Sequence, residues 1–225
     1  MVAKLREHNL SLFFAVIFLL ALFGQSVAGL ALFNEDQLSH GSNAISYGAY
    51  ITSSDFVVDV AENWQSEFLQ FFVFILATVW LVQRGSPESK KPGDEGIDSD
   101  EAQLLARFAK SKSPKWAKAG GWRTAIYSNS LLILMGVIFL LSWFTQSVAG
   151  TTVYNDEQAA HGQPSIDWLG YVASADFWSR TLQNWQSEFL AVGCMVAFSI
   201  FLRQRGSSES KPVGTPHAET ATEGE

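Results

Sequence analysis

Two glutamates within apolar stretches carry the strongest chemical signal in this sequence. Glu67 and Glu188 occupy the same place in the heptapeptide Asn-Trp-Gln-Ser-Glu-Phe-Leu, which occurs at 63–69 and again at 184–190. A carboxyl group inside a membrane must be protonated, hydrogen-bonded or neutralised by a cation. Such a pair could conduct protons or cations, or it could form polar contacts that hold helices together. The sequence favours polar contacts between helices.

The residues around the two glutamates extend this polar character. Asn63 and Glu67 are four residues apart and lie on one helical face, as do their counterparts in the second heptapeptide. Counting about 1.5 Å per residue along each apolar segment places Gln25 at the height of Glu67. Gln146 and Glu188 match in the same way, so we expect contacts within both pairs. The candidate polar site comprises Gln25, Asn63, Glu67, Gln146, Asn184 and Glu188.

A second motif, Asn-x-x-Gln-x-x-His-Gly at 34–41 and 155–162, places His40 and His161 beside acidic residues. Histidine with carboxylates can bind a divalent metal. A histidine followed by glycine is also typical of a helix end, where glycine occupies the C′ position. Because each motif holds a single histidine, the sequence favours the helix end, and we assign no metal site.

These motifs occur twice because the sequence is duplicated. Residues 10–90 align without a gap with residues 131–211 at an offset of 121, and about 36 of the 81 positions are identical. Each copy contains two apolar segments. The segment Gln-Ser-Val-Ala-Gly, at 25–29 and 146–150, places small residues at helical spacing, which favours close packing. The duplication predicts two tandem helical hairpins.

The apolar segments predict four transmembrane helices, at about 10–33, 63–83, 131–153 and 184–204. The first and third are long enough to span a hydrocarbon core of about 30 Å. The second and fourth span it only if the Asn-Trp-Gln-Ser-Glu residues enter the outer leaflet. The N-terminus also resembles a signal peptide. Retention is favoured because Gln-Ser-Val-Ala-Gly recurs at 146–150, where no signal peptidase acts.

The distribution of positive charge predicts the orientation. Residues 33–67 contain no Lys or Arg, and residues 154–188 contain only Arg180. The remaining Lys and Arg residues lie near the termini and between the copies, so these parts are expected to be cytoplasmic. The two hairpins then have the same orientation, related by an axis along the membrane normal. The external loops carry about eleven carboxylates and should attract cations.

We expect four regions: a first hairpin repeat (1–92), a cytoplasmic linker (93–121), a second hairpin repeat (122–211) and a disordered cytoplasmic tail (212–225). Within the linker, Ser99 could cap a short helix over Asp100–Lys110. The tail is rich in Gly, Thr, Glu and Pro, a composition typical of disorder.

Several function classes are excluded by the residues present. Cys194 is the only cysteine, so no internal disulfide chemistry is available. No phosphate-binding or dinucleotide-binding glycine motif and no metalloprotease motif occurs. All four histidines lie outside the predicted spans, which argues against haem ligation in the bundle. The basic linker adjoins a predicted span and is not expected to bind nucleic acid. We therefore expect no catalytic residue and no cofactor.

The chain resembles a family of bacterial integral membrane proteins that is described only as a domain of unknown function. The resemblance rests on Ser26–Gly29, Asn63–Gln70 and Gln83–Lys90 and on their second copies. The second copy departs from the pattern at Ala191 and Ser208, where the first has Gln70 and Pro87. The resemblance implies a bacterial inner-membrane location and no particular activity.

Together these observations predict an all-α membrane protein that is not an enzyme and has a structural or assembly role. The alternative is a small cation or proton channel or transporter that uses Glu67 and Glu188. In either case the expected partner of the protein is the lipid bilayer. A homodimer would enlarge the lumen of a channel, since four helices alone enclose little space. The sequence names no protein partner.

Overall fold

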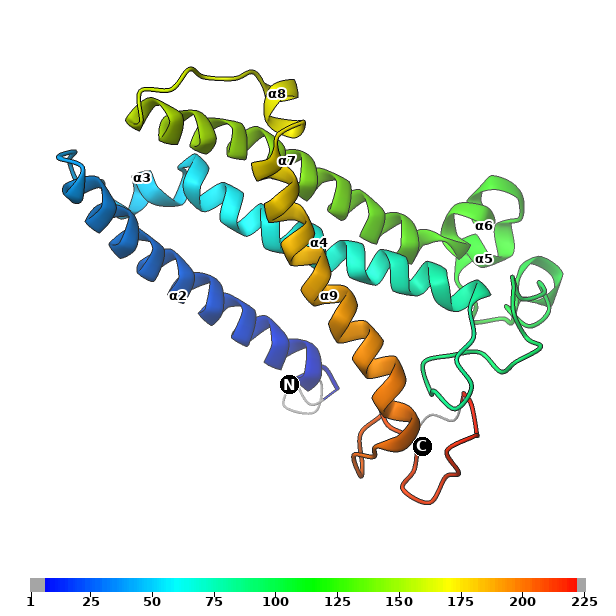
Figure 1. The fold of residues 1–225 in the computed structure, drawn as a ribbon. Coiled ribbons are helices and arrows are strands. Elements are labelled where there is room, and N and C mark those ends of the chain that lie inside the picture. The colour runs from blue at the N-terminus through cyan, green and yellow to red at the C-terminus, as the bar shows by residue number, and fades with distance from the viewer. Residues whose placement is uncertain (1–6, 222–225) are drawn as a thin grey trace. The chain divides into compact units, whose positions relative to one another are not determined.

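The computed structural model describes residues 7–221, and all regular structure in this part of the chain is helical (Figure 1). The all-α class predicted from the sequence is thereby confirmed. The elements are α2 (Asn9–Ser39), α3 (Tyr47–Ile51), α4 (Ser54–Trp80), the 3-10 helix η1 (Ala106–Phe108), α5 (Lys115–Ala119), α6 (Gly121–Ser128), α7 (Ser130–Ala160), α8 (Trp168–Val172) and α9 (Ala175–Phe201).

Two helices, α2 and α7, are long and apolar enough to cross a membrane, and each contains 31 residues. Within the described residues, Ser26 is the only buried residue of α2. Apolar side chains are exposed along the whole of α2, from Leu10 at 72% to Leu32 at 69%. Exposed apolar surface costs about 25 cal/mol per Å² in water, whereas lipid accommodates it. These two helices support a membrane location.

The helices α4 and α9 each contain 27 residues and begin at equivalent serine caps. The Ser53 hydroxyl accepts a hydrogen bond from the Phe56 amide at 3.3 Å, and Ser174 accepts one from the Phe177 amide at 3.2 Å. Both helices run without a break through the Asn-Trp-Gln-Ser-Glu segment, as expected from the sequence. Whether α4 and α9 cross the membrane stays a prediction.

The described chain divides into two compact units, and each unit takes residues from both copies of the repeat. Unit 1 contains Met1–Ala61 and Thr145–Val172, and unit 2 contains Glu62–Phe144 and Ala173–Glu225. The boundary between them falls within α4 and within α7. The predicted regions (two repeats, a linker and a tail) are consecutive stretches of the sequence, whereas each unit combines distant segments. The division into these regions stays a prediction.

In unit 1, loop contacts of the first copy recur in the second copy 121 residues later. Asn34 exchanges two hydrogen bonds with the backbone of Ile45, at 3.1 and 2.8 Å. Asn155 exchanges two with the backbone of Ile166, both at 2.9 Å. In each copy, one asparagine near the end of a long helix therefore holds the returning loop.

A tyrosine in the short helix after each loop packs against the long helix in unit 1. A Cβ atom at Gly29 would collide with Tyr50, and one at Gly150 would collide with Tyr171. Both tyrosines are buried. The glycine of each Gln-Ser-Val-Ala-Gly segment is therefore required for space, and the residue that approaches it is a loop tyrosine.

An aromatic cluster fills part of unit 2 where α7 meets α9. The Trp143 ring lies 6.0 Å from Phe177, 5.9 Å from Trp178 and 5.9 Å from Trp185, measured between ring centroids. Large aromatic groups bury much area per residue, so this cluster contributes strongly to the packing of the two helices. Its equivalent in the first copy differs in composition, because Leu22 replaces Trp143 there.

The linker differs from the prediction. The helix expected over Asp100–Lys110 is replaced by turns and η1, and Leu104 and Ala106 take positive φ values of 52° and 48°. Ser99 still accepts a hydrogen bond from the Ala102 amide at 3.2 Å.

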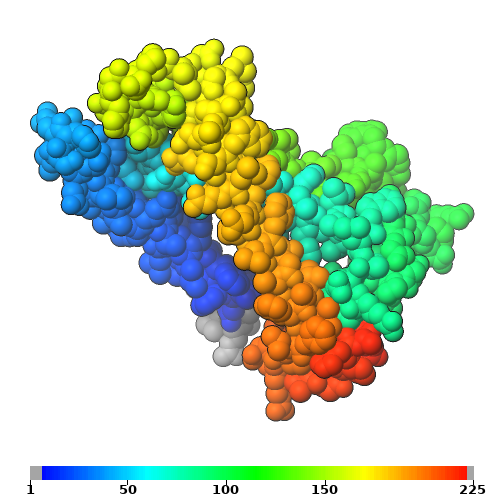
Figure 2. Space-filling view, viewed as in Figure 1, coloured from blue at the N-terminus to red at the C-terminus, as the bar shows by residue number. Residues whose placement is uncertain are grey.

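The tail has turns between Pro212 and Ala221, and residues 222–225 lie outside the described part. Its disorder stays a prediction. Figure 2 shows the tail in red beside the end of α9 in orange. The Arg203 guanidinium donates to the Thr215 carbonyl at 3.1 Å, and the His217 ring lies 3.0 Å from the Ile200 carbonyl.

Candidate functional site

The polar residues of α4 and α9 meet in unit 2 through a charged contact. The Glu62 carboxylate accepts hydrogen bonds from the Arg180 Nε atom at 2.9 Å and from the Asn184 amide at 2.9 Å. The second guanidinium nitrogen of Arg180 is also 2.9 Å from Glu62. The Glu62 side chain is only 14% exposed. The only Lys or Arg of the predicted external segments is therefore used to join the two copies.

One turn further along α4, a second polar contact lies beside the first. The Gln65 side-chain oxygen accepts a hydrogen bond from the Trp185 indole at 2.8 Å. Gln65 and Ser66 are buried, whereas the equivalent residues of the second copy, Gln186 and Ser187, are exposed. The two heptapeptides are identical in sequence, yet they have different surroundings.

The structure places the predicted glutamates near each other. Glu67 of α4 is exposed, and Glu188 of α9 is half-buried. Their carboxylates are close enough to interact electrostatically. Asn63 is exposed, whereas Asn184 binds Glu62. Of the six predicted residues, Asn184, Glu67 and Glu188 thus lie where α4 and α9 approach.

The two predicted glutamines, both in unit 1, have different surroundings in the two copies of the repeat. Gln25 is half-buried, whereas Gln146 is fully buried, and its amide makes no hydrogen bond within the described residues. The predicted contacts of Gln25 with Glu67 and of Gln146 with Glu188 stay predictions.

The neighbouring serines carry the polar contacts of that segment. The Ser26 hydroxyl is 2.8 Å from the Tyr47 hydroxyl. The Ser147 hydroxyl accepts a hydrogen bond from the Trp168 indole at 3.0 Å. Nothing in the sequence distinguishes these serines from small packing residues.

The predicted external histidines lie at the ends of the two long helices. The His40 Nδ1 atom is 3.0 Å from the Asp36 carbonyl, and the His161 Nδ1 atom is 2.8 Å from the Glu157 carbonyl. Gly41 and Gly162 follow with φ values of 77° and 69°. Among residues 7–221 no group of three or more His, Cys, Asp or Glu residues could hold a metal ion. The geometry is that of a helix end.

The segment Gln-Arg-Gly-Ser-x-Glu-Ser-Lys folds into the same turn in both copies. The Ser89 hydroxyl accepts a hydrogen bond from the Gln83 amide at 2.7 Å, and Ser210 accepts one from the Gln204 amide at 2.9 Å. Each turn holds its last residue, Lys90 or Lys211, in a fixed position.

The two lysines differ in their surroundings. Lys90 donates to the Gly96 carbonyl and to the Asp98 carboxylate, each at 2.7 Å. Lys211 is 1% exposed and donates to carbonyls of Gly85, Pro216, His217 and Glu219 at 2.6–3.3 Å. Burial lowers the pKa of the Lys211 ammonium group, and the nearby Arg203 lowers it further. Lys211 thus ties the tail to the turn of the first copy.

The site as a whole is a line of polar contacts along α4 and α9, with no arrangement of nucleophile and base among the contacts described. Glu62, Gln65 and Trp185, which make the shortest contacts of this site, are not among the residues predicted from the sequence. The presence of Arg180 in an otherwise acidic segment was the one available signal that a carboxylate partner was needed.

The comparisons with known proteins give a family and no activity. No curated protein and no solved structure matches the chain. A family profile does match, over residues 1–222, which is nearly the whole sequence. This agrees with the resemblance noted in the repeated motifs. The chain therefore belongs to the family described as Domain of unknown function (DUF6766).

Proposed function

We propose that this protein is a multi-pass protein of the bacterial inner membrane, built from two tandem hairpin repeats with four transmembrane helices. The hairpins are α2 with α4 and α7 with α9. The support is the recurrence of the same contacts at an offset of 121 residues, seen at Asn34 and Asn155 and at Ser89 and Ser210. Both termini and the linker are cytoplasmic, in keeping with the positive residues there.

In this topology α4 and α9 cross the bilayer with their polar beginnings at the outer surface. A helix of 27 residues is about 40 Å long, which exceeds a hydrocarbon core of about 30 Å. The first turns, which hold Asp55 and Asp176, then lie outside the core, and the Asn-Trp-Gln-Ser-Glu segments lie in the outer leaflet.

The molecular role that fits this geometry best is a non-enzymatic structural or assembly function. The observation that carries this proposal is the contact of Glu62 with Arg180 and Asn184. It uses charged groups to fix one copy against the other. Polar contacts of this kind stabilise helix association in membranes. A homodimer could extend the same assembly.

A cation or proton pathway is the second candidate, because the Glu67 and Glu188 carboxylates interact electrostatically. Two carboxylates of equivalent position attract a proton or a cation to the space between them.

Flux measurements in proteoliposomes distinguish the two candidates. We would compare the wild type with the double variant Glu67→Gln, Glu188→Gln, after confirming that the variant inserts and folds. A structural role predicts no proton or cation flux from either protein. Flux in the wild type that disappears in the variant would establish the pathway and contradict the structural proposal. As a matched control, Gln186→Glu is added to the double variant. It places a carboxylate in the same segment of α9 without restoring the pair of Glu67 and Glu188.

A further inference from the structure

Six positively charged side chains precede the start of α7 in unit 2, in a stretch of chain without acidic residues. Residues 102–128 contain no Asp or Glu, so their net charge is +6. All six basic side chains are exposed: Arg107, Lys110, Lys112, Lys115, Lys118 and Arg123. Among residues 7–221, no ion pair joins any of them to a carboxylate. We call residues 107–128 the basic surface.

The basic surface is held together by contacts within the segment. The helix α5 packs against both η1 and α6. The Thr124 hydroxyl of α6 donates a hydrogen bond to the Trp116 carbonyl of α5 at 2.8 Å. The Lys118 ammonium group donates one to the Ser111 carbonyl at 2.6 Å. Figure 1 shows α5 and α6 in green beside the beginning of α7. The positive charges are therefore carried on a folded element.

The same helices expose apolar side chains. Trp122 and Ile126 lie four residues apart on one face of α6 and are 64% and 44% exposed. Thr124, which binds α5, lies on the opposite face. The exposed Trp116 ring lies 6.1 Å from the Trp122 ring, measured between centroids, and the Arg123 guanidinium lies 5.5 Å from the Trp122 centroid. An exposed apolar face with basic side chains is typical of a helix at a membrane surface.

The place of this surface in the chain also fits a membrane boundary. The helix α6 ends at Ser128, and α7, which is long and apolar enough to cross a membrane, begins at Ser130. Because α6 contains eight residues, it is about 12 Å long. Its charged and aromatic side chains therefore stay close to the point at which α7 would enter the bilayer.

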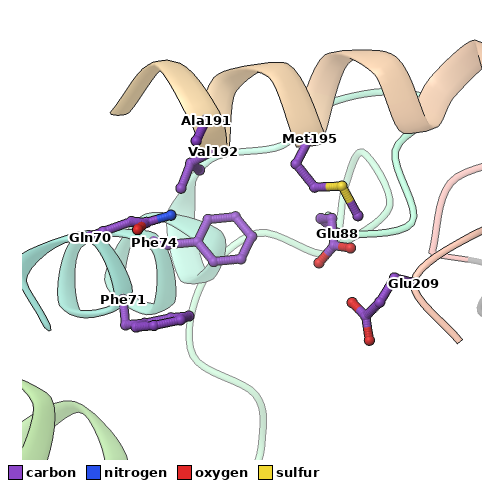
Figure 3. Close-up of a pocket in the computed structure, with 8 residues that line it drawn as sticks. All are labelled: Gln70, Phe71, Phe74, Glu88, Ala191, Val192, Met195 and Glu209. Carbon is purple, nitrogen blue, oxygen red and sulfur yellow. The ribbon is translucent and has the colours of Figure 1, made fainter. Parts of the chain in front are cut away.

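Carboxylates elsewhere in unit 2 lie in other surroundings. The Asp98 carboxylate accepts hydrogen bonds from the Lys90 ammonium group and the Gln103 amide, both at 2.7 Å. Glu88 and Glu209 lie around a cavity beside α4 and α9, to which the basic surface contributes no residue (Figure 3). These carboxylates leave the positive charge of the basic surface exposed.

We propose that the basic surface binds the headgroups of anionic phospholipids where α7 enters the membrane. The inference rests on the membrane location proposed above, and in that topology the surface faces the inner leaflet. The basic side chains contact the lipid phosphates, while Trp116, Trp122 and Ile126 enter the boundary between headgroups and acyl chains. Each Lys or Arg near an anionic surface strengthens binding about fivefold. The surface should therefore distinguish phosphatidylglycerol from phosphatidylcholine.

Nucleic acid is the other polyanion that attracts basic surfaces with aromatic side chains. Stacking of bases would use Trp116 and Trp122 but would leave Ile126 in water. A bilayer takes up all three side chains, and it also accounts for the position of the surface directly before α7. The observations thus favour lipid.

A fluorescent label at position 126 of the full-length protein in lipid nanodiscs tests the proposal. Cys194→Ala removes the native cysteine, and Ile126→Cys provides the attachment point for a bimane group. Quenching by acrylamide, which is uncharged, is compared between nanodiscs of phosphatidylcholine and nanodiscs of equal parts phosphatidylcholine and phosphatidylglycerol. The quenching constant should be at least twofold lower in the mixture. The difference should disappear at about 1 M salt, where the Debye length is about 3 Å.

The variant Lys110→Gln, Lys112→Gln, Lys115→Gln should lose the difference between the two lipids. Three charges account for a factor on the order of a hundred in binding to an anionic surface. Thermal unfolding of this variant separates lost lipid binding from lost folding.

The matched control is Arg84→Gln, Lys91→Gln, Arg205→Gln, which removes three exposed positive charges outside the basic surface and should preserve the difference. Equal quenching in the two lipids would overturn the proposal, as would a difference that persists in the variant without the three lysines. Protection of the label by a short DNA duplex, in place of phosphatidylglycerol, would assign the surface to nucleic acid.

The experiment also separates this inference from the proposed function. Nanodiscs expose both sides of the bilayer, so the result does not depend on the number of spans or on their orientation. A protein that enters nanodiscs but shows no lipid preference at position 126 would contradict the inference alone. A protein that does not enter nanodiscs would contradict the membrane location and, with it, this inference.

Discussion

Lys211 and Lys90 occupy equivalent positions in the two copies, but only Lys211 is enclosed by the protein. Its ammonium group contacts four backbone carbonyls that come from the turn of the first copy and from the tail. An ammonium group has three protons and gains from such contacts when water is removed. In the second copy, the lysine of the Gln-Arg-Gly-Ser-x-Glu-Ser-Lys motif therefore also holds the tail.

Replacing Lys211 with Met should destabilise the protein by about 3 kcal/mol, because it leaves buried carbonyl oxygens without a donor. Replacing Lys90 with Met should cost less than about 1 kcal/mol, because its partner Asp98 is accessible to water. Thermal unfolding in detergent, followed by circular dichroism, would measure both changes. Equal effects of the two substitutions would contradict the role assigned to Lys211.

Asp55, in the first turn of α4, gives a prediction about pH. Burial raises the pKa of Asp55, and the nearby Asp156 raises it further, while the Asp55 backbone amide opposes the change. A carboxyl group with a raised pKa in the folded state contributes stability below its ordinary value of 3.8, which is lost as pH rises through the folded pKa. Asp55→Asn should therefore reduce the loss of stability between pH 4 and neutrality.

The control for this prediction is Asp176→Asn, which alters the equivalent residue of the second copy. Melting temperatures measured at several pH values for both variants would make the comparison. If Asp176→Asn reduced the pH dependence as much as Asp55→Asn, the assignment to Asp55 would be wrong.

At the scale of elements, the sequence predicted the type and number of the long helices but not their ends. The first predicted span, 10–33, lies within α2, which continues to Ser39. It extends because Asn34–Ser39 can remain helical outside the apolar region, until Gly41 allows the chain to turn. The contact of Glu62 with Arg180 could not be predicted, because it joins residues 118 apart and depends on how α4 crosses α9.

The ion pair between these helices should be measurable by a double-mutant cycle. Glu62→Gln and Arg180→Gln should each destabilise the protein, and their coupling energy should be on the order of 1 kcal/mol, since the pair is partly exposed. The exchange Glu62→Arg, Arg180→Glu should recover part of the loss. Strictly additive effects would show that the pair does not fix α4 to α9.

At the scale of the molecule, the central claim is that four helices cross the membrane. Among residues 7–221, only α2 and α7 are long and apolar enough to do so on length and composition alone. If they were the only spans, α4 and the linker would lie on the external side. The duplication predicts otherwise, since every element of the first hairpin has an equivalent in the second.

Cysteine accessibility in spheroplasts separates the two topologies most directly. Cys194→Ala removes the only native cysteine, and single cysteines are then introduced at Ser42, Ser99 and Gln163. With four spans, a membrane-impermeant maleimide labels the cysteines at 42 and 163 in intact spheroplasts, and the one at 99 only after permeabilisation. Labelling at 42 and 99 but not at 163 in intact spheroplasts would show that only α2 and α7 cross, and would contradict the account.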